Sequence, residues 1–176
     1  MPDSKNSNSL RTQALPGIAM PFSPEAEQSV LGAILLDSSC MDRVTEFLPK
    51  PEYFYGVNNG LIYEAMLELF TAGKPVDFIT VLETLKENGS FDEATGKVYL
   101  MQLAQIVPSI SGVEAYAKIV RDKYDVRTLI LAARQILEDA MEGGVDASTL
   151  LDSAEQRIFD IRRGKNMQGL QPLGEV

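Results

Sequence analysis

PFSPEAEQSVLGAILLD, residues 21–37, carries the clearest helix start in this chain. Ser23 is a preferred N-cap residue, and Pro24 follows at the first helical position, where a missing N–H costs nothing. Glu25 and Glu27 lie near the positive end of the helix dipole. Apolar residues then recur at the spacing of one helical face, at Ala26, Val30, Leu31, Ile34 and Leu35. The stretch therefore predicts an amphipathic helix that packs against other helices.

Gly32 interrupts the apolar face of this helix. A glycine inside a helix costs roughly 0.5–1 kcal/mol relative to alanine. Two interpretations stay open: the helix tolerates the glycine, or a second helix approaches closely at this position.

The segments that follow are also predicted to be helical, so the expected fold class is all-α. Asn58 and Asp77 are candidate N-caps, and Gly73 and Gly89 are candidate stops. PEYFY, residues 51–55, is predicted to form a single turn that buries an aromatic side chain. The expected helices of this region cover residues 39–48, 58–72, 78–88 and 97–106.

The C-terminal third predicts a long helix and a shorter one, which form a protruding αα-hairpin behind a small helical head. SGVE at 111–114 has the spacing of a capping box, and no proline or glycine follows until Gly143. A helix of roughly 30 residues would be about 45 Å long. Asp146 or Ser148 then caps a last helix that ends near residues 162–164. The predicted seam between the two helices is Ala147, Leu151, Ala154, Ile158 and Ile161.

The long helix has more apolar surface than one partner helix can cover. Three of its large apolar residues are consecutive, so they cannot all face the same neighbour. Either the head covers the remaining side chains or a second chain does, and we expect self-association. The candidate self-association residues are Leu129, Ile130, Leu131, Leu151 and Ile158.

Composition limits the possible functions. The chain has 176 residues, 45% of them apolar, which is enough to bury a core. Its net charge of −9 opposes strong binding to nucleic acid or to an anionic membrane. Cys40 is the only cysteine, so no internal disulfide can form, which fits a reducing cytoplasm. No apolar run approaches the roughly 18 residues of a membrane span, and residues 1–20 do not have the pattern of a signal peptide.

Residues suited to catalysis are scarce. The chain contains no histidine, the commonest acid–base catalyst and metal ligand. The Gly-Lys pairs at 73–74, 96–97 and 164–165 all lack the Ser or Thr that completes a phosphate-binding loop. Cys40 has no base to pair with and is expected to be a core or surface residue rather than a nucleophile. We therefore predict no catalytic, cofactor-binding or metal-binding residues.

Two features have a nucleic-acid alternative, although packing is the favoured interpretation of each. The side chains of Tyr53, Phe54 and Tyr55 have the shape to stack on bases, but no basic groove is predicted around them. Acidic residues alternate with the basic residues of the long helix, which is typical of a salt-bridged exposed face. The basic residues are Lys118, Arg121, Lys123, Arg127 and Arg134.

Separated stretches of this chain resemble, in order, the N-terminal domain of bacterial replicative DNA helicases of the DnaB type. They are SPEAEQSVLGAILLD, YEAMLELFTAGKPVDFITVLETLKENG, and YLMQLAQIVPS with EAYAKIVRDKYDVRTLI. The resemblance runs from about Phe22 to Val176. It implies a helical head, a hairpin and a linker into a RecA-like ATPase motor. The expected segments are a disordered tail at 1–21, a head at 22–110, a hairpin at 111–164 and the start of the linker at 165–176.

By this resemblance the chain is a non-catalytic domain, and no catalytic residue carries over onto its sequence. In the family, six such domains form a collar, a trimer of dimers held together in part by the hairpins. The collar docks the DnaG-type primase, and a helicase loader is a further candidate partner. ATP and Mg²⁺ belong to the motor, which the resemblance places beyond Val176.

Two alternatives belong to other classes. The helicase-binding C-terminal domain of a primase resembles this fold. The tail RGKNMQGLQPLGEV, residues 163–176, argues against it, because it is typical of a linker that continues into a further domain. A stand-alone helical enzyme is the other alternative, and the missing histidine and phosphate-binding loop argue against it.

Overall fold

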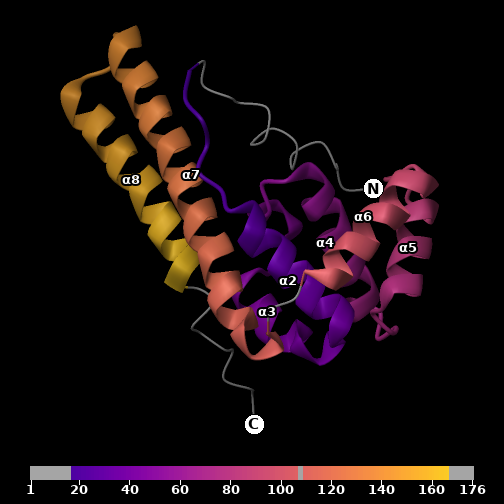
Figure 1. Cartoon of the computed structure of the whole chain (residues 1–176). Coiled ribbons are helices and arrows are strands. Elements are labelled where there is room, and N and C mark those ends of the chain that lie inside the picture. The colour runs from indigo at the N-terminus through magenta and orange to yellow at the C-terminus, as the bar shows by residue number, and fades with distance from the viewer. Residues whose placement is uncertain (1–16, 107–108, 167–176) are drawn as a thin grey trace. The chain divides into compact units, whose positions relative to one another are not determined.

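A computed structural model describes residues 17–106 and 109–166, and every regular element in these ranges is helical, as predicted (Figure 1). The predicted tail up to residue 16 and the predicted linker from residue 167 lie outside the described residues. The α-helices are α2 (Pro24–Leu36), α3 (Met41–Phe47), α4 (Val57–Thr71), α5 (Phe78–Glu87), α6 (Glu93–Gln105), α7 (Val113–Glu142) and α8 (Ala147–Asn166). Short 3₁₀ turns at Ser38–Cys40, Pro51–Tyr53 and Ile110–Gly112 connect some of them.

The start of α2 confirms the prediction from sequence. Ser23 has extended backbone geometry, and its hydroxyl accepts a hydrogen bond from the Ala26 N–H at 3.2 Å. Pro24 occupies the first turn, where no intrahelical acceptor is available for an N–H. Gly32 is buried within the helix.

Two glycines and one aspartate set the limits of α4 and α5. Gly73 and Gly89 follow these helices with φ of +66° and +63°, the left-handed conformation that glycine adopts without strain. Asp77 caps α5, as predicted, by accepting from the N–H groups of Ile79 and Thr80 at 2.9 Å each. The prediction of Asn58 as the cap of α4 is wrong, because α4 begins at Val57 and Gly56 is at the cap position.

Two other helix starts also differ from prediction. The helix expected from residue 97 begins at Glu93, and Gly96 lies inside it. A Cβ at Gly96 would lie 3.0 Å from the Cβ of Phe91, so the glycine leaves room for this ring. The capping box expected at residues 111–114 does not form. Ser111 lies in a 3₁₀ turn before α7, and Glu114 instead pairs with Arg43 at 3.5 Å.

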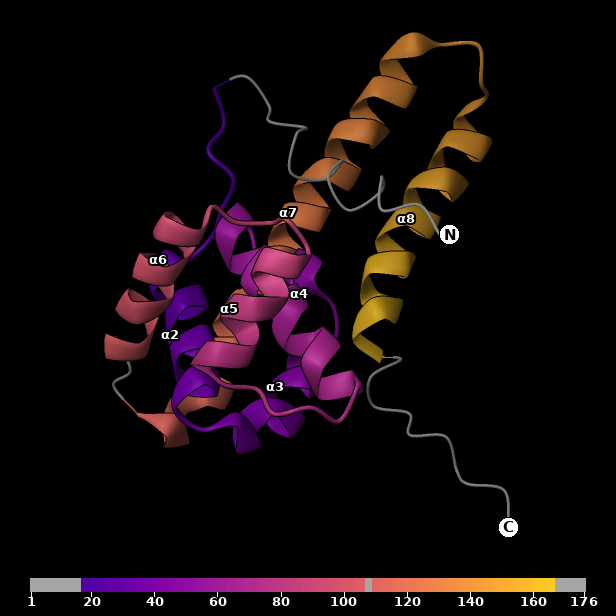
Figure 2. The same ribbon diagram turned by 90° about the vertical axis from the view of Figure 1, so that its right-hand side faces the viewer.

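Four helices form the body of the head. α2 packs against α4 and α6, and α5 packs against the same two helices, so the four enclose one core (Figures 1 and 2). The first turns of α7 add Val113, Ala117 and Val120 to this core. Its largest fully buried side chains include Tyr63, Phe54, Leu31, Ile34 and Met41.

The chain divides into two compact units, Met1–Tyr124 and Asp125–Val176. The division falls inside α7, so the first twelve residues of this helix belong with the head. The second unit consists of the rest of α7, a turn and α8. Gly143 and Gly144 have φ of +76° and +86°, which allows the chain to reverse there. Asp146 precedes α8, and Gly164 lies inside this helix rather than ending it.

Candidate functional site

Glu27 is a buried carboxylate that caps a helix other than its own. Only 1% of its surface is exposed. Its Oε1 accepts hydrogen bonds from the Gly56 N–H at 3.0 Å and from Asn59 Nδ2 at 3.1 Å, and its Oε2 accepts from the Tyr55 N–H at 3.0 Å. Tyr55 and Gly56 directly precede α4. Glu27 in α2 therefore satisfies N–H groups at the start of α4, where a negative charge is also favoured by the helix dipole.

A hydrogen-bonded network extends from Glu27 to a third helix. Asn59 Oδ1 accepts from the Tyr99 hydroxyl, which in turn accepts from Gln28 Nε2 at 3.5 Å. A Cβ at Gly56 would lie 2.8 Å from Asn59 Nδ2 and 3.1 Å from Glu27 Oε1, so this position requires glycine for space. The network joins α2, α4 and α6 at one place in the head.

Sequence reasoning missed this network, although one signal for it was present. Glu27 stands three, four and seven residues before Val30, Leu31 and Ile34, which is the spacing of the buried face. Glu25 does not share this spacing and is exposed. The partners of Glu27 lie 28 to 32 residues away, so no local pattern identifies them.

The aromatic turn at residues 51–55 is a packing element, as favoured from the sequence. Phe54 is fully buried and its ring centroid lies 4.7 Å from that of Tyr63. Tyr53 is buried and its ring centroid lies 4.3 Å from that of Tyr124. Burial raises the pKa of Tyr63, and its hydroxyl donates to the Leu48 carbonyl.

The described residues contain no constellation suited to catalysis. Among them, no group of three or more Cys, Asp or Glu side chains is arranged to hold a metal ion. Cys40 is buried in the core, and burial raises the pKa of its thiol, the opposite of what a nucleophile needs. The pKa of Asp37 is lowered, but the cause is its hydrogen bonds with Ser39 beside it. None of the helices described is both long enough and apolar enough to cross a membrane.

The hairpin, residues 125–166, exposes most of the predicted self-association residues. Leu129, Leu151 and Ile158 are 47%, 64% and 44% exposed. Ile130 and Leu131 are half-buried. The structure adds exposed apolar residues that sequence reasoning did not select, namely Val126, Leu137, Met141, Val145 and Phe159. Both α7 and α8 therefore carry exposed large apolar side chains in the second unit.

The α8 residues that are half-buried in the hairpin differ in part from those predicted to lie at the seam with α7. Ala154 and Ile161 are half-buried, as predicted, but Ala147, Leu151 and Ile158 are exposed. Leu150, Ser153 and Arg157 are half-buried instead, and Arg157 pairs with Asp139 of α7 at 3.1 Å. The prediction that Leu151 and Ile158 are covered at the seam is therefore wrong, although Leu151 still lines a groove between the two helices.

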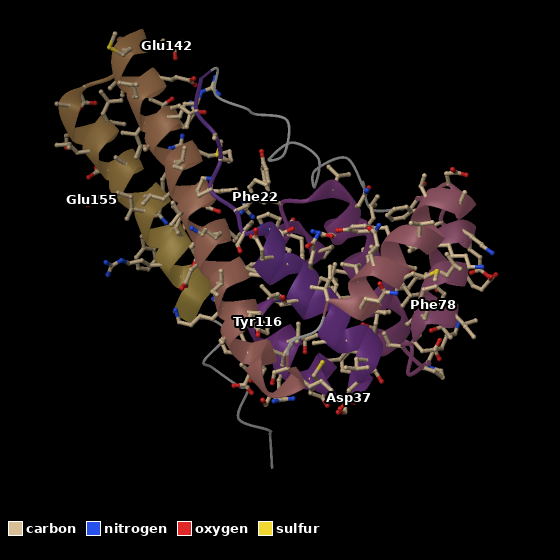
Figure 3. All side chains as sticks on the ribbon, viewed as in Figure 1. Phe22, Asp37, Phe78, Tyr116, Glu142 and Glu155 are labelled. Atoms are coloured by element: carbon tan, nitrogen blue, oxygen red, sulfur yellow. The ribbon has the colours of Figure 1, made fainter. Side chains whose placement is uncertain are left out.

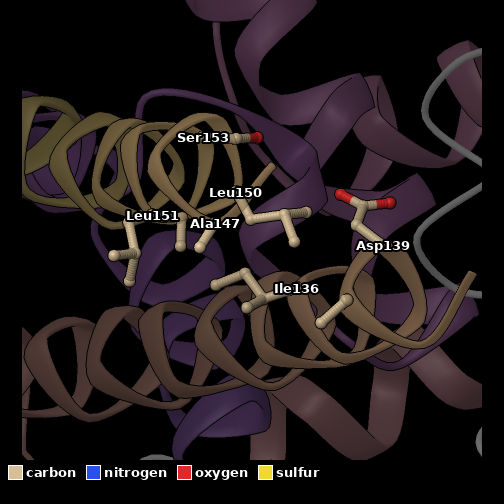
Figure 4. Close-up of a pocket in the computed structure, with 8 residues that line it drawn as sticks. Ile136, Asp139, Ala147, Leu150, Leu151 and Ser153 are labelled. Atoms are coloured by element: carbon tan, nitrogen blue, oxygen red, sulfur yellow. The ribbon is translucent and has the colours of Figure 1, made fainter. Parts of the chain in front are cut away.

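A groove of about 320 Å³ lies between the two helices near the turn that joins them (Figure 4). Ile136 and Asp139 contribute from α7, and Leu150 and Leu151 from α8. Ala140, Ala147, Ser153 and Ala154 complete the lining. Small side chains on both helices thus leave a mainly apolar hollow in the hairpin.

Two of the five basic residues of α7 are held in ion pairs with carboxylates of the same helix, as expected for a salt-bridged face. Lys118 pairs with Asp122 at 2.6 Å and Arg134 pairs with Glu138 at 2.7 Å, each one helical turn apart. Arg127 departs from the prediction, because it is only 7% exposed.

Comparison with known proteins decides the family. The model of the DnaB-like helicase N terminal domain matches residues 19–122, more than half of the chain. The chain belongs to this family. It is 38% identical over 156 residues to the replicative DNA helicase DnaC of Bacillus subtilis and 36% identical to the replicative DNA helicase DnaB of Geobacillus stearothermophilus. Each match covers 89% of the chain but only 34% of the relative, so the chain spans about a third of their length.

Solved structures agree with this assignment. The crystal structure of the N-terminal domain of DnaB helicase from Mycobacterium tuberculosis is 33% identical, with a TM-score of 0.74, over 81% of this chain and 99% of that one. A structure of a DnaB-like replicative helicase and its interactions with primase is 23% identical, with a TM-score of 0.63, over 85% of this chain and 36% of that one. The second likeness shows the fold alone. The resemblance and the all-α fold class inferred from the sequence are both confirmed.

Proposed function

We propose that this chain is the assembly and docking domain of a replicative DNA helicase. In this role it associates with other copies of itself to form the collar of a hexamer, and it presents a surface to a DnaG-type primase. Family membership supports the helicase over the alternative of a primase domain. ATP and Mg²⁺, in this proposal, serve the parent helicase, and a helicase loader is a further candidate partner.

The observation that carries the proposal is the exposed apolar surface of the hairpin. Five of its side chains, Leu129, Leu137, Met141, Leu151 and Phe159, are between 47% and 79% exposed. Removing such side chains from water is worth roughly 1.5–3 kcal/mol for each one fully buried. A second copy that covers them would therefore gain several such contributions at once. Exposed large apolar side chains in such number are typical of a surface that contacts another protein.

Self-association is tested with Leu129→Glu, which places a charge on this surface. We expect the unmodified chain to form at least dimers at tens of micromolar, and the variant to dissociate while keeping its helical circular dichroism. Ile79→Glu is the matched control, because Ile79 is 70% exposed but lies in α5 of the head. Light scattering measures the mass of each. A monomeric unmodified chain, or equal dissociation of both variants, would contradict the proposal.

Primase docking is tested by calorimetry with the cognate full-length primase. We expect saturable binding by the unmodified chain, because the proposal assigns this surface to the head or the hairpin. The Leu129→Glu variant shows whether docking requires the associated form: weaker binding with intact helicity indicates that two copies build the docking surface. A flat titration with active cognate primase would count against this part of the proposal.

A further inference from the structure

Two asparagines in this chain are each followed by a glycine, and this pair of residues is chemically labile. The backbone nitrogen of the second residue can attack the side-chain amide of the asparagine, and glycine obstructs this attack least because it has no Cβ. The two pairs are Asn59 with Gly60 and Asn88 with Gly89. Both have the same covalent chemistry, so a difference in their reactivity has to come from the fold.

The side chain of Asn59 is held in the buried network of the head. It is 6% exposed, and its Nδ2 donates to Glu27 Oε1 at 3.1 Å while its Oδ1 accepts from the Tyr99 hydroxyl. The Gly60 N–H, whose nitrogen would have to attack this amide, donates to the Gly56 carbonyl at 2.9 Å. Turning the amide toward Gly60 would therefore break two side-chain hydrogen bonds and leave buried groups without partners.

The side chain of Asn88 lies in a different setting, at the end of α5. This helix begins at Phe78, which Figure 3 labels, and Asn88 is its exposed C-cap residue. The Asn88 Nδ2 donates to Oε2 of Glu68, an exposed residue, at 3.2 Å. The Gly89 N–H donates to the Lys86 carbonyl at 3.0 Å. A Cβ at Gly89 would meet no atom within 4 Å, so there is open space in which the chain can rearrange.

The end of a helix opens more easily than a buried network does. Frayed helix ends open at almost no cost in free energy, whereas core segments open at a cost that approaches that of global unfolding. At the end of α5, opening breaks the Gly89 hydrogen bond and an exposed contact with Glu68. At Asn59, opening separates side chains of α2, α4 and α6. The reactive geometry is therefore reached far more often at Asn88 than at Asn59.

We propose that Asn88 is a site of spontaneous deamidation and that the fold protects Asn59 from the same reaction. The Gly89 nitrogen loses its proton and bonds to Asn88 Cγ, the Cγ–Nδ2 bond breaks, and ammonia leaves with a proton taken from water. Water then opens the resulting succinimide ring at either of its carbonyl carbons. The products are aspartate and isoaspartate, and in isoaspartate the backbone continues through the former side-chain carbonyl. The inference does not depend on self-association.

Either product places a negative charge where the end of α5 does not favour one. The new carboxylate would replace the amide that now donates to Glu68, so two carboxylates would lie close together. It also lies at the negative end of the helix dipole of α5. Isoaspartate in addition lengthens the backbone just before the N–H groups of Gly89 and Ser90, which donate to carbonyls of α5. The conversion therefore weakens the contact between α4 and α5.

Peptide mapping by mass spectrometry measures the two sites separately. Trypsin places Asn88 in the peptide 87–97 and Asn59 in the peptide 44–86. During incubation of the folded chain at mildly alkaline pH, we expect Asn88 to become a carboxylate at least about tenfold faster than Asn59. A sample digested before incubation corrects for conversion during digestion. An equal or faster rate at Asn59, or no conversion of Asn88, would overturn the proposal.

A denatured sample tests whether the fold sets this difference. In guanidinium chloride both pairs are equally free to rearrange, so we expect the two rates to become similar. A difference that persists in denaturant would belong to the neighbouring sequence and would overturn the protective role of the fold. Asn88→Gln verifies the assignment, because the longer side chain does not form the succinimide ring and the mass gain of its peptide should be lost.

Variants of the network test what protects Asn59. We expect Glu27→Ala to accelerate conversion at Asn59 and to leave the rate at Asn88 unchanged, and Glu25→Ala, at an exposed position of the same turn, to change neither. Tyr99→Phe removes only the second hydrogen bond to Asn59 and replaces Glu27→Ala if circular dichroism shows that the latter is unfolded. An unchanged rate at Asn59 in the folded variants would overturn the assignment of its protection to this network.

Discussion

At the scale of single residues, Glu27 shows how a buried charge is accommodated without a cation. Moving a carboxylate out of water is costly unless its oxygens are hydrogen-bonded. Here two backbone N–H groups and the Asn59 amide supply the hydrogen bonds, and the N-terminal end of α4 supplies favourable partial charge. The carboxylate and the start of α4 therefore depend on each other.

Replacing Glu27 should reveal this dependence. Glu27→Ala leaves three donors without an acceptor, and we expect it to lower the free energy of unfolding by about 3 kcal/mol or more. Glu27→Gln keeps one acceptor oxygen and should have a smaller effect. Glu25→Gln, at an exposed position of the same turn, should change stability by less than about 0.5 kcal/mol. Urea unfolding measures all three, and equal effects at positions 25 and 27 would contradict this account.

At the scale of elements, α5 has the most complete start in the head. The Asp77 carboxylate accepts from the Thr80 N–H, and the Thr80 hydroxyl accepts from the Asp77 N–H at 3.0 Å, so the two residues form a capping box. We expect Asp77→Ala to destabilise the protein by about 0.5–2 kcal/mol, because two N–H groups lose their acceptor. Thermal unfolding measures the change. Glu83→Ala, in the same helix, removes only an exposed ion pair with Lys86 and is the control.

The helices that sequence reasoning located well are those with local end signals. Each of these signals acts on backbone groups within a few residues of itself, so it can be recognised from the sequence alone. The signals are Ser23, Gly73, Asp77 and Gly89. The start of α6 was predicted at residue 97 rather than at Glu93, because a glycine is unfavourable inside a helix. In the structure Gly96 lies inside α6, where it leaves space for the Phe91 side chain. α4 was given the wrong cap because its true partner is in α2.

The hairpin shows a second limit of sequence reasoning. Helical periodicity separates apolar residues into faces, but it does not say which face is covered. Leu150 and Leu151 are adjacent and chemically identical and both line the groove beside α7, yet Leu150 is half-buried and Leu151 is exposed. The length and limits of α7 were predicted correctly because no proline or glycine interrupts it. The candidate self-association residues themselves remain predictions.

At the scale of the whole molecule, charge is distributed unevenly. Residues 137–156 contain six carboxylates and no lysine or arginine, whereas residues 157–166 contain four basic residues and one acidic residue. Two of the six carboxylates, Glu138 and Asp139, are paired with arginines. The hairpin thus carries its excess negative charge near the turn between α7 and α8.

This distribution predicts weak binding to duplex DNA. A chain of net charge −9 repels the phosphate backbone, so we expect a dissociation constant weaker than about 10 μM at physiological salt. A fluorescence titration with labelled duplex at two salt concentrations measures it. Sub-micromolar affinity that falls steeply as salt rises would show that a basic surface has been overlooked.

The cap that Glu27 supplies to α4 also bears on the order in which the chain folds. Its carboxylate is separated from the two backbone N–H groups by 28 and 29 residues, so no local segment contains both partners. Closing that loop costs conformational entropy before the hydrogen bonds form. As the chain folds, we expect the first turn of α4 to stay frayed until it meets α2. The two helices then become protected from hydrogen exchange together, as one cooperative unit.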